Sequence, residues 1–267
     1  MDKNTTIADK MKIIHNAQRP NIDDIIKEVF DGFIELHGDR LYGEDHAMCG
    51  GIARLNGTPV TVIGQRKGHT TAENIQANFG MPHPEGYRKA LRLAKQAEKF
   101  HRPIVCFVDT PGAFCGIGAE ERGQGEAIAR NLYEFMGLRT PVVSVVTGEG
   151  GSGGALAIAV ANEVYMMQNA MYSVISPRGC ASILWKDASR ELEAAEALKV
   201  TAQDLYRFGM IEGIIREGIS NLAYYKNIKS VLTQSMKRLS GLSGDALREQ
   251  RYEKFRKIGV FSDIKTQ

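Results

Sequence analysis

The stretch TPVVSVVTGEGGSGGALAIAVAN, residues 140–162, decides how this chain is expected to fold. Residues 141–146 are almost entirely apolar, which predicts a buried strand. Five glycines fall within residues 148–154, and residues 155–161 contain only Ala, Leu, Ile and Val, which predicts a buried helix. A glycine elbow between strand and helix lets a ligand approach bare backbone and directs the unpaired N–H groups of the helix start at it. We therefore predict that this elbow, Thr147 to Ala155, is an oxyanion hole made of main-chain amides.

Three known motifs overlap in the elbow and have to be distinguished from an oxyanion hole. Residues 150–154 fit G-x-S-x-G, the nucleophile elbow of serine hydrolases, but all six histidines precede Ser152, whereas a hydrolase triad runs Ser, acid, His. Residues 148–153 fit the dinucleotide fingerprint, but the next predicted strand ends in amides at 165–169, where that motif needs an acid. No Lys-Ser or Lys-Thr pair follows the glycines, which excludes a P-loop. The remaining alternative is that the glycines only permit tight packing.

Composition limits the classes of function to consider. The 267 residues carry 34 basic and 31 acidic side chains, a balance that argues against binding to nucleic acid or to a membrane surface. Four cysteines, at 49, 106, 115 and 180, form no C-x-x-C pair, which predicts reduced thiols in the cytoplasm and no metal site. No apolar run reaches about 18 residues, and the charged residues 1–12 do not resemble a secretory signal. We expect a single domain over residues 1–267.

Outside the elbow, periodicity and turn residues predict the remaining elements. In order, they are a helical arm at 5–17 within residues 1–20, a helix capped by Asn21 that runs through Leu36 to Gly38, strands at 47–55 and 59–66 joined by a hairpin at Asn56-Gly57, a surface loop at 67–86 with one turn of helix, a helix at 84–100, a strand at 104–110, a helix at 119–137, strands near 163–168 and 170–176, a helix at 177–185, amphipathic helices at 187–208 and 220–258, and a short strand at 211–217.

The order strand, elbow, helix occurs twice in succession, at 104–137 and 141–162, and a looser third unit follows. Such repeated units with short links predict a parallel sheet covered by helices. Two elbows at the same edge of neighbouring strands can line one pocket, where ligands of open α/β sheets bind. We interpret the mainly helical residues 187–267 as a region that packs on the core or associates with a second subunit.

The predicted helix at 84–100 carries a basic stripe formed by Arg88, Arg92, Lys95 and Lys99. A solvated face accounts for such a stripe. The alternative is that its cations, Arg88 and Arg92 among them, attract phosphates such as those of coenzyme A.

Long strings of this sequence resemble the carboxyltransferase alpha subunits of bacterial acetyl-CoA carboxylases. The resemblance extends from about Phe30 to Ile215. It rests on ELHGDRLYGED at 35–45, NFGMPHPEGYRKALRLAKQAEKF at 78–100, DTPGAFCGIGAEERGQGEAIARNL at 109–132, GEGGSGGALAIAVAN at 148–162 and SVISPRGCASILWKD at 173–187. It implies the α/β crotonase-like (ClpP/crotonase) superhelix of repeated ββα units, with C-terminal helices used in association.

The resemblance also implies a reaction and its partners. Carboxybiotin on a biotin carboxyl carrier protein, formed with a biotin carboxylase, gives its carboxyl group to acetyl-CoA, and malonyl-CoA forms for fatty acid biosynthesis. ATP and nucleotide binding are further properties that the resemblance implies for this protein. The site is shared with a zinc-ribbon beta subunit that holds the zinc, in a cytoplasmic complex that is an alpha2-beta2 heterotetramer. Biotin itself serves as the base, and negative oxygens develop on its ureido group and on the thioester enolate.

Carried over residue by residue, the family's hole for the biotin oxygen falls on the N–H groups of Gly153 and Gly154. Gly150 and Gly151 shape the turn and the pocket. Residues of the first elbow, Ala113, Gly116 and Gly118, are the expected pocket wall. Losing one oxyanion donor typically costs about 2.7–4 kcal/mol of barrier, on the order of a hundred- to a thousandfold in rate.

The sequence departs from the family's pattern in three places, which bear on local contacts and leave the expected fold unchanged. Arg178 stands where an acid is usual, His69 replaces a basic residue, and Glu217 to Ser220 replace a Gly-Gly-Ala-His segment.

Two further functions compete with this one. A stand-alone acyl-CoA hydratase or hydrolase of the same fold would use an acidic side chain near the elbows, for which Glu120, Glu121 and Glu149 are the candidates. A non-catalytic scaffold would use the elbows only for packing.

Overall fold

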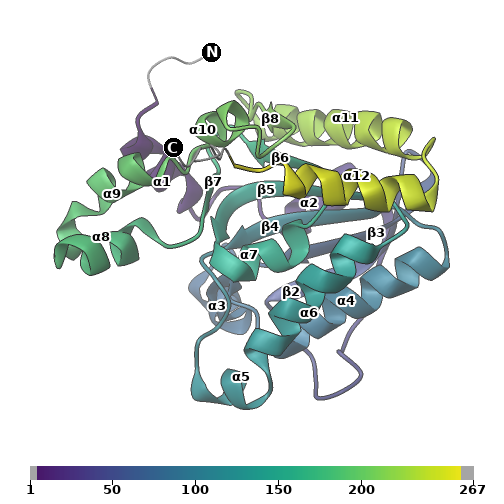
Figure 1. Ribbon diagram of the computed structural model, residues 1–267, viewed down its shortest axis with the longest axis horizontal. Coiled ribbons are helices and arrows are strands. Elements are labelled where there is room, and N and C mark those ends of the chain that lie inside the picture. Colours follow the sequence, from purple (N-terminus) through teal and green to yellow (C-terminus); the bar gives the residue numbers. More distant parts are fainter. Residues whose placement is uncertain (1–4, 260–267) are drawn as a thin grey trace, which may run out of the picture.

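The computed structural model describes residues 5–259 and consists of a twisted sheet with helices on both faces (Figure 1). The strands are β1 (Asp31–Glu35), β2 (Met48–Leu55), β3 (Thr58–Gln65), β4 (Ile104–Thr110), β5 (Val142–Gly151), β6 (Glu163–Met167), β7 (Met171–Ser173) and β8 (Gly213–Ile215). The helices are α1 (Ile7–Ile14), α2 (Ile22–Val29), α3 (Thr71–Gln76), α4 (Pro84–Lys99), α5 (Ile117–Glu121), α6 (Gln124–Gly137), α7 (Ser152–Ala159), α8 (Pro177–Trp185), α9 (Glu191–Leu198), α10 (Ala202–Arg207), α11 (Asn221–Leu239) and α12 (Gly244–Arg256), with 3-10 turns at Asn78–Gly80 and Ala188–Arg190.

The sheet has the strand order β1-β2-β3-β4-β5-β6-β8, and β7 pairs with the end of β5. β2 pairs antiparallel with both of its neighbours, β1 and β3, whereas every pairing from β3 onward is parallel. The carboxyl ends of β3, β4 and β5 therefore lie at one edge of the sheet. This parallel half confirms the sheet predicted from the repeated strand–helix units.

Two glycines show how closely the helices approach the two faces of the sheet. A Cβ on Gly50 of β2 would collide with Leu93 of α4, and a Cβ on Gly64 of β3 would lie 2.8 Å from the Ile22 side chain of α2. Gly64 pairs with Cys49, the residue before Gly50, so the two glycines point to opposite faces. The helix layers α4–α6–α7 and α2–α11 consequently enclose the core from the two sides.

Several elements lie where the sequence predicts them. Asn56 and Gly57 both have positive φ, 49° and 82°, and join β2 to β3 as a two-residue hairpin. Asn21 caps α2 by accepting the N–H groups of Asp23 and Asp24 at 3.0 and 3.1 Å. The arm forms α1, whose Thr6 and Asp9 make a reciprocal capping box. The predicted strand at 104–110 coincides with β4.

The prediction that the helix after Asn21 runs to Gly38 is wrong. α2 ends at Val29, and residues 31–35 form β1, which pairs with β2 at Ile34 opposite Ile52. Phe33 and Leu36 do contact the core, but from this strand and from the residue that follows it. Gly51 of β2 has no space for a Cβ because the Ile34 carbonyl occupies it, so the pairing with β1 depends on a contact that helical periodicity does not reveal.

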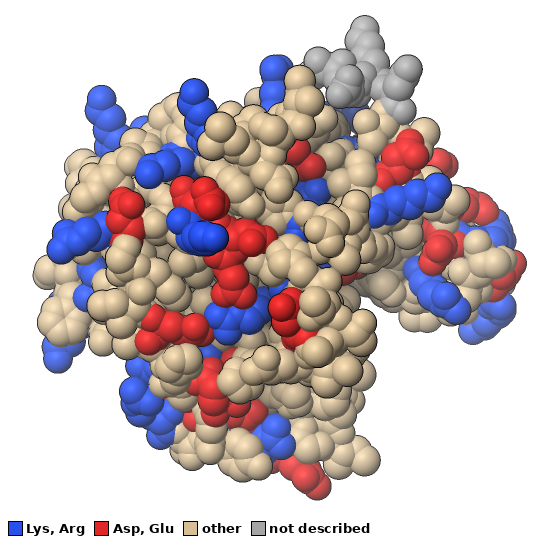
Figure 2. Space-filling view, turned by 180° about the vertical axis from the view of Figure 1, so that it is seen from behind, with Lys and Arg blue, Asp and Glu red and all other residues tan. Residues whose placement is uncertain are grey.

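Three predicted helices are divided in the structure. The segment 119–137 is α5 and α6, separated by Gly123, whose φ of 83° is left-handed. The segment 187–208 is a 3-10 turn with α9 and α10, and 220–258 is α11 and α12, which begins after the Ser243 cap. α8 and α9 stand out from the body as a lobe (Figures 1 and 2).

On the face shown in Figure 2, acidic and basic side chains lie beside one another, without a large area of one sign. This distribution matches the formal net charge of +3.

Candidate active site

The elbow between β5 and α7 is sharper and lies later than the sequence predicts. β5 continues through the first three glycines of the elbow to Gly151, and α7 begins at the next residue. The chain reverses at Ser152, which has a φ of 53° although it is not glycine. Left-handed backbone at such a residue costs of order 1–3 kcal/mol and concentrates at functional sites.

The first N–H groups of α7 have no hydrogen-bond acceptor outside the helix in the part of the chain that the structure describes. Gly153 and Gly154 lie in the first turn, where amides have no partner within the helix. Among residues 5–259, no acceptor outside α7 takes a hydrogen bond from either amide, and no side chain caps the helix. A Cβ on Gly153 would approach only the Ile128 methyl, at 3.5 Å, so the space beside this amide is open.

The two elbows meet at Gly154. Its Cα packs against the backbone of Gly112 and Ala113 in the first elbow, and no room remains for a Cβ. The Ala113 N–H also donates to no acceptor in the described chain. Gly154 therefore packs the two elbows together, and Ala113 is the residue of the first elbow that the fold brings to it.

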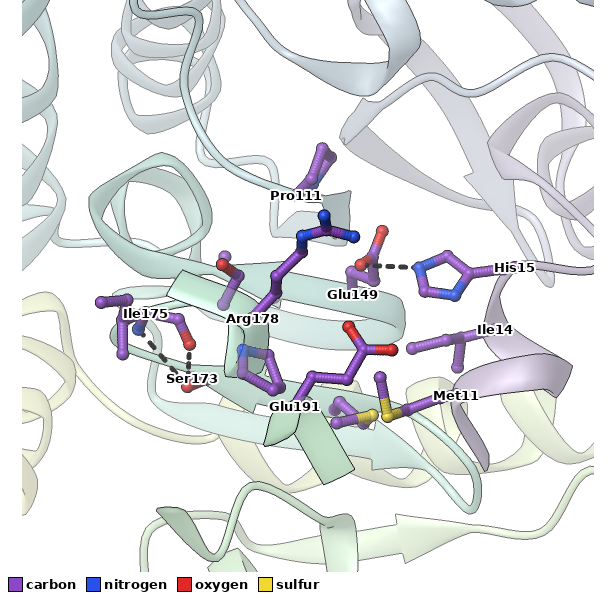
Figure 3. A pocket seen from close by; sticks show the side chains of 14 residues that line it. Met11, Ile14, His15, Pro111, Glu149, Ser173, Ile175, Arg178 and Glu191 are labelled. Carbon is purple, nitrogen blue, oxygen red and sulfur yellow. Dashed lines mark hydrogen bonds and ion pairs between the residues drawn. The ribbon is translucent and has the colours of Figure 1, made fainter. Parts of the chain in front are cut away.

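Two cavities border the second elbow. Gly150 and Gly151 line a cavity of about 170 Å³, shown in Figure 3, together with His15 of the arm and Arg178 of α8. Ser152 and Gly153 line a cavity of about 500 Å³ whose other walls are almost entirely apolar: Leu132, Met136, Leu156, Ala159, Val160, Val164, Tyr172, Ser173, Val174, Leu205, Met210, Phe255 and Ile258. The second volume lies in the range usual for small-molecule sites.

The other predicted pocket residues lie elsewhere. Gly116 and Gly118 precede and begin the short helix α5, beside Phe114 and Arg122 respectively. Neither they nor Ala113 line the two cavities that border the second elbow. In Figure 1, α5 lies at the bottom edge of the molecule, whereas α8 and α9 lie at its left edge.

The basic stripe of α4 is engaged in contacts within the chain. Arg88 pairs with Asp39 at 2.8 Å and with Glu85 at 2.9 Å, and Arg92 donates to the carbonyls of Gly38 and His37. Both guanidinium groups thus fasten residues 37–39 to α4. Phosphate binding by Arg88 would require these ion pairs to open.

None of the side chains around the elbow is arranged as a base or nucleophile. Burial opposes ionisation of Glu149, but hydrogen bonds and charges from His15 and Lys67 outweigh it and lower its pKa to about 2. Glu120 and Glu121 are exposed on α5. Ser152 has no histidine in contact within the described chain, and burial raises the pKa of Cys106 to about 12.

Residues 5–259 contain no cluster of three or more His, Cys, Asp or Glu side chains that could hold a metal ion. Within the same residues, every helix is too short or too polar to cross a bilayer.

A charge cluster next to the elbow was not predicted. Lys67 Nζ lies 2.8 Å from Asp109 Oδ1 and 2.7 Å from Glu149 Oε2, and His15 Nε2 lies 3.0 Å from Glu149 Oε1. Asp109 and Glu149 each belong to an elbow motif. Their polar character inside otherwise apolar or glycine-rich segments is the signal that could have identified them.

Two of the departures from the family's pattern hold the N-terminal arm. Glu217 accepts two hydrogen bonds from Arg19, at 2.9 and 2.7 Å, and His69 contacts the Ala17 carbonyl at 2.6 Å and Asp24 at 2.8 Å. Arg178, the third, lines the smaller cavity.

Solved structures share this fold. A transcarboxylase 12S, solved with methylmalonyl-coenzyme A and methylmalonic acid bound, superposes with a TM-score of 0.71 at 18% identity over 90% of this chain and 46% of that one. The beta subunit of P. aeruginosa geranyl-CoA carboxylase superposes with a TM-score of 0.67 at 14% identity, over 91% and 46% of the two chains. This chain thus spans about half the length of these neighbours. The fold is that of the crotonase-like carboxyltransferases, which confirms the predicted class.

Sequence comparison then gives the family. The chain belongs to the acetyl co-enzyme A carboxylase carboxyltransferase-like family, whose model matches residues 1–259. It is 59% identical over 254 residues to the acetyl-coenzyme A carboxylase carboxyl transferase subunit alpha of Clostridium perfringens, covering 93% of this chain and 94% of that protein. The corresponding subunit of Bacillus cytotoxicus is 56% identical over 264 residues, covering 97% and 82%.

Proposed function

We propose that this chain is the alpha half of a biotin-dependent carboxyltransferase, which with a beta subunit moves a carboxyl group from biotin to acetyl-CoA and forms malonyl-CoA. Membership of the carboxyltransferase family and the fold support this proposal. The observation that carries it is the unpaired N–H of Gly153 at the edge of a large apolar cavity.

The elbow fits the group that the family implies. When bound, biotin supplies the carboxyl group and, after transfer begins, the base that removes the methyl proton. Gly153 offers its N–H without a side chain in the way, and the positive end of α7 favours a negative oxygen there. The walls of the 500 Å³ cavity are mostly apolar, and a low local dielectric strengthens such a hydrogen bond.

The ionic state of the neighbouring side chains supports the same function. A hydratase or hydrolase needs a carboxyl group that exchanges protons near neutral pH. Glu149 is held as a carboxylate by Lys67 and His15, and so it is unsuited to that role.

The finer features of the complex are part of the proposal. They are a zinc-ribbon beta subunit, an alpha2-beta2 assembly, delivery of biotin by a carboxyl carrier protein and biotin carboxylase, and a location in the cytoplasm. Their support is the subunit-alpha naming of the relatives.

The test is co-expression of the chain with candidate zinc-ribbon partners, followed by an assay of malonyl-CoA decarboxylation with free biotin. Turnover by the complex, and little or none by either chain alone, is the expected result. Hydration or hydrolysis of acyl-CoA thioesters by the isolated chain would instead support the stand-alone enzyme.

A further inference from the structure

The end of β3 connects the two elbows through a buried glutamine. Gln65 is 1% exposed, and its Nε2 donates to the Gly154 carbonyl at 2.8 Å while its Oε1 accepts the Asp109 N–H at 3.1 Å. A carbonyl needs a donor and an N–H needs an acceptor, so the primary amide satisfies both with its two ends. Gln65 therefore links the end of β4 to the start of α7.

Two residues later, Lys67 makes a second connection between the same elbows. Its ammonium contacts the carboxylates of both Asp109 and Glu149, and the three side chains are only 14–24% exposed. Burial alone would lower the pKa of Lys67, but the two carboxylates outweigh it and raise the pKa, so the group stays charged. Without this cation, two carboxylates would face each other in a partly buried site.

These contacts fix backbone as well as side chains. Asp109 Oδ1, which binds Lys67, also accepts the Glu149 N–H at 2.9 Å. Gly148 packs its Cα on the same carboxylate. The peptides of Glu149 and Gly154 are thus held from one side, and the turn with Ser152 and Gly153 lies between these two fixed points.

We infer that Gln65 and Lys67 are positioning residues for carboxyl transfer, which set the direction of the Gly153 and Gly154 amides without touching the substrate. This inference rests on the proposed function of the elbow. The N–H groups of glycines in a turn take their orientation from the contacts around the turn. Displacing such a donor by about 1 Å can cost on the order of a hundredfold in rate.

The experiment uses the full chain in complex with its beta partner and measures kcat and KM for malonyl-CoA decarboxylation. Gln65→Met and Lys67→Met keep approximate length and remove the contacts. We expect kcat to fall roughly ten- to a hundredfold with KM and assembly unchanged. Lys67→Arg keeps the charge and should restore most of kcat. Gln65→Glu should restore it at low pH, where a protonated carboxyl group can donate to the Gly154 carbonyl, and lose it as that group ionises.

A matched control is Lys254→Met. Lys254 is 11% exposed and pairs with Glu212 at 2.6 Å, away from the elbow. The Lys254→Met substitution also removes a partly buried ion pair, so a general effect of losing such a pair would appear in this variant too. Wild-type kcat per folded complex is the expected result.

Hydrogen exchange of the peptide covering residues 148–156 gives a readout independent of transfer. Faster exchange in Gln65→Met and Lys67→Met is expected whether or not the wild-type complex transfers carboxyl groups, so failure of the proposed function is distinguishable from failure of this inference. Unchanged kcat and exchange in folded Met variants would overturn the inference, as would a loss confined to KM or to assembly. Should those variants not fold, a pH-independent kcat ratio of Gln65→Glu to wild type would overturn it.

Discussion

The Cα of Gly154 lies directly against the backbone nitrogen of Ala113, at a separation that leaves no room for a Cβ between them. Gly154 begins a helix and Ala113 follows another strand, so this contact joins the two elbows of neighbouring parallel strands. Both amides are unpaired within the described residues, apart from α7 itself. The elbow is therefore a structure made by two segments, and each part of it can be tested separately.

Gly153→Val should give a folded protein that still assembles but has lost transfer activity. The built Cβ meets only Ile128 at an ordinary distance, yet the branched side chain would cover the amide that we assign to the negative oxygen. Loss of one such donor lowers kcat on the order of a hundred- to a thousandfold. Gly125→Val is the matched control, because Gly125 is an exposed helical glycine with open space around it. Retained activity in Gly153→Val would remove this amide from the mechanism.

Gly154→Ala should behave differently, by lowering stability as well as activity. Its Cβ would overlap Ala113 and lie 2.9 Å from the Tyr87 hydroxyl, all within a buried region. Overpacking of this kind costs typically about 1–3 kcal/mol. Urea unfolding of the purified chain measures the loss, and a wild-type midpoint would show that the elbows can separate freely.

Ser152→Gly should keep full transfer activity and leave stability equal or higher. The left-handed backbone at Ser152 suits glycine better, and relief of such strain is worth about 1 kcal/mol. Unfolding midpoints and the decarboxylation assay measure the two effects. Abolished turnover in Ser152→Gly would instead indicate that Ser152 acts as a nucleophile.

Arg251→Met should destabilise the packing of α12 strongly. Arg251 is fully buried and donates to the carbonyls of Phe135, Leu138 and Thr140, among others, and to Asn162. Burial lowers its pKa to about 10, yet it remains charged at neutral pH and satisfies the carboxyl end of α6. Leaving several buried acceptors unpaired should cost about 3 kcal/mol or more in the free energy of unfolding. Arg248→Met on the same helix, half-exposed, should cost little.

Attachment of the arm to the elbow should depend on pH through His15. Its hydrogen bond to Glu149, opposed in part by burial and by the charge of Lys67, raises the pKa of the imidazole above the ordinary value of about 6.5. The other charged side chains that line the small cavity beside His15 are Arg178 and Glu191. The contact between His15 and Glu149 therefore stabilises the attached arm fully at pH values below the pKa of His15 in the unfolded chain. This stabilisation is lost as the pH rises through the raised pKa of His15 in the folded chain. The protection factors of residues 7–14, which correct hydrogen exchange for its intrinsic rise with pH, should fall over that interval, and this fall should be absent in His15→Gln.

The predictable parts of the fold were those encoded locally. The hairpin at Asn56-Gly57, the Asn21 cap and the strand before the first elbow each follow from a few adjacent residues, and the structure has them in place. β1 was missed because its pairing depends on Gly51 of β2, which lies at a distance in sequence. The break of the helix at Gly123 was missed because one left-handed glycine can end a helix whose apolar pattern continues.

By itself, the sequence determined the elbow's composition, the parallel arrangement of the strands that precede the elbows and the family, because strand–turn–helix patterns and long matching strings are local. Only the tertiary structure decided which amides are free, that Gly154 meets Ala113, and that Gln65 and Lys67 hold both elbows. The physical reason is that a backbone amide gains its direction from neighbours on other strands, and such neighbours are brought together by the sheet and not by the order of residues.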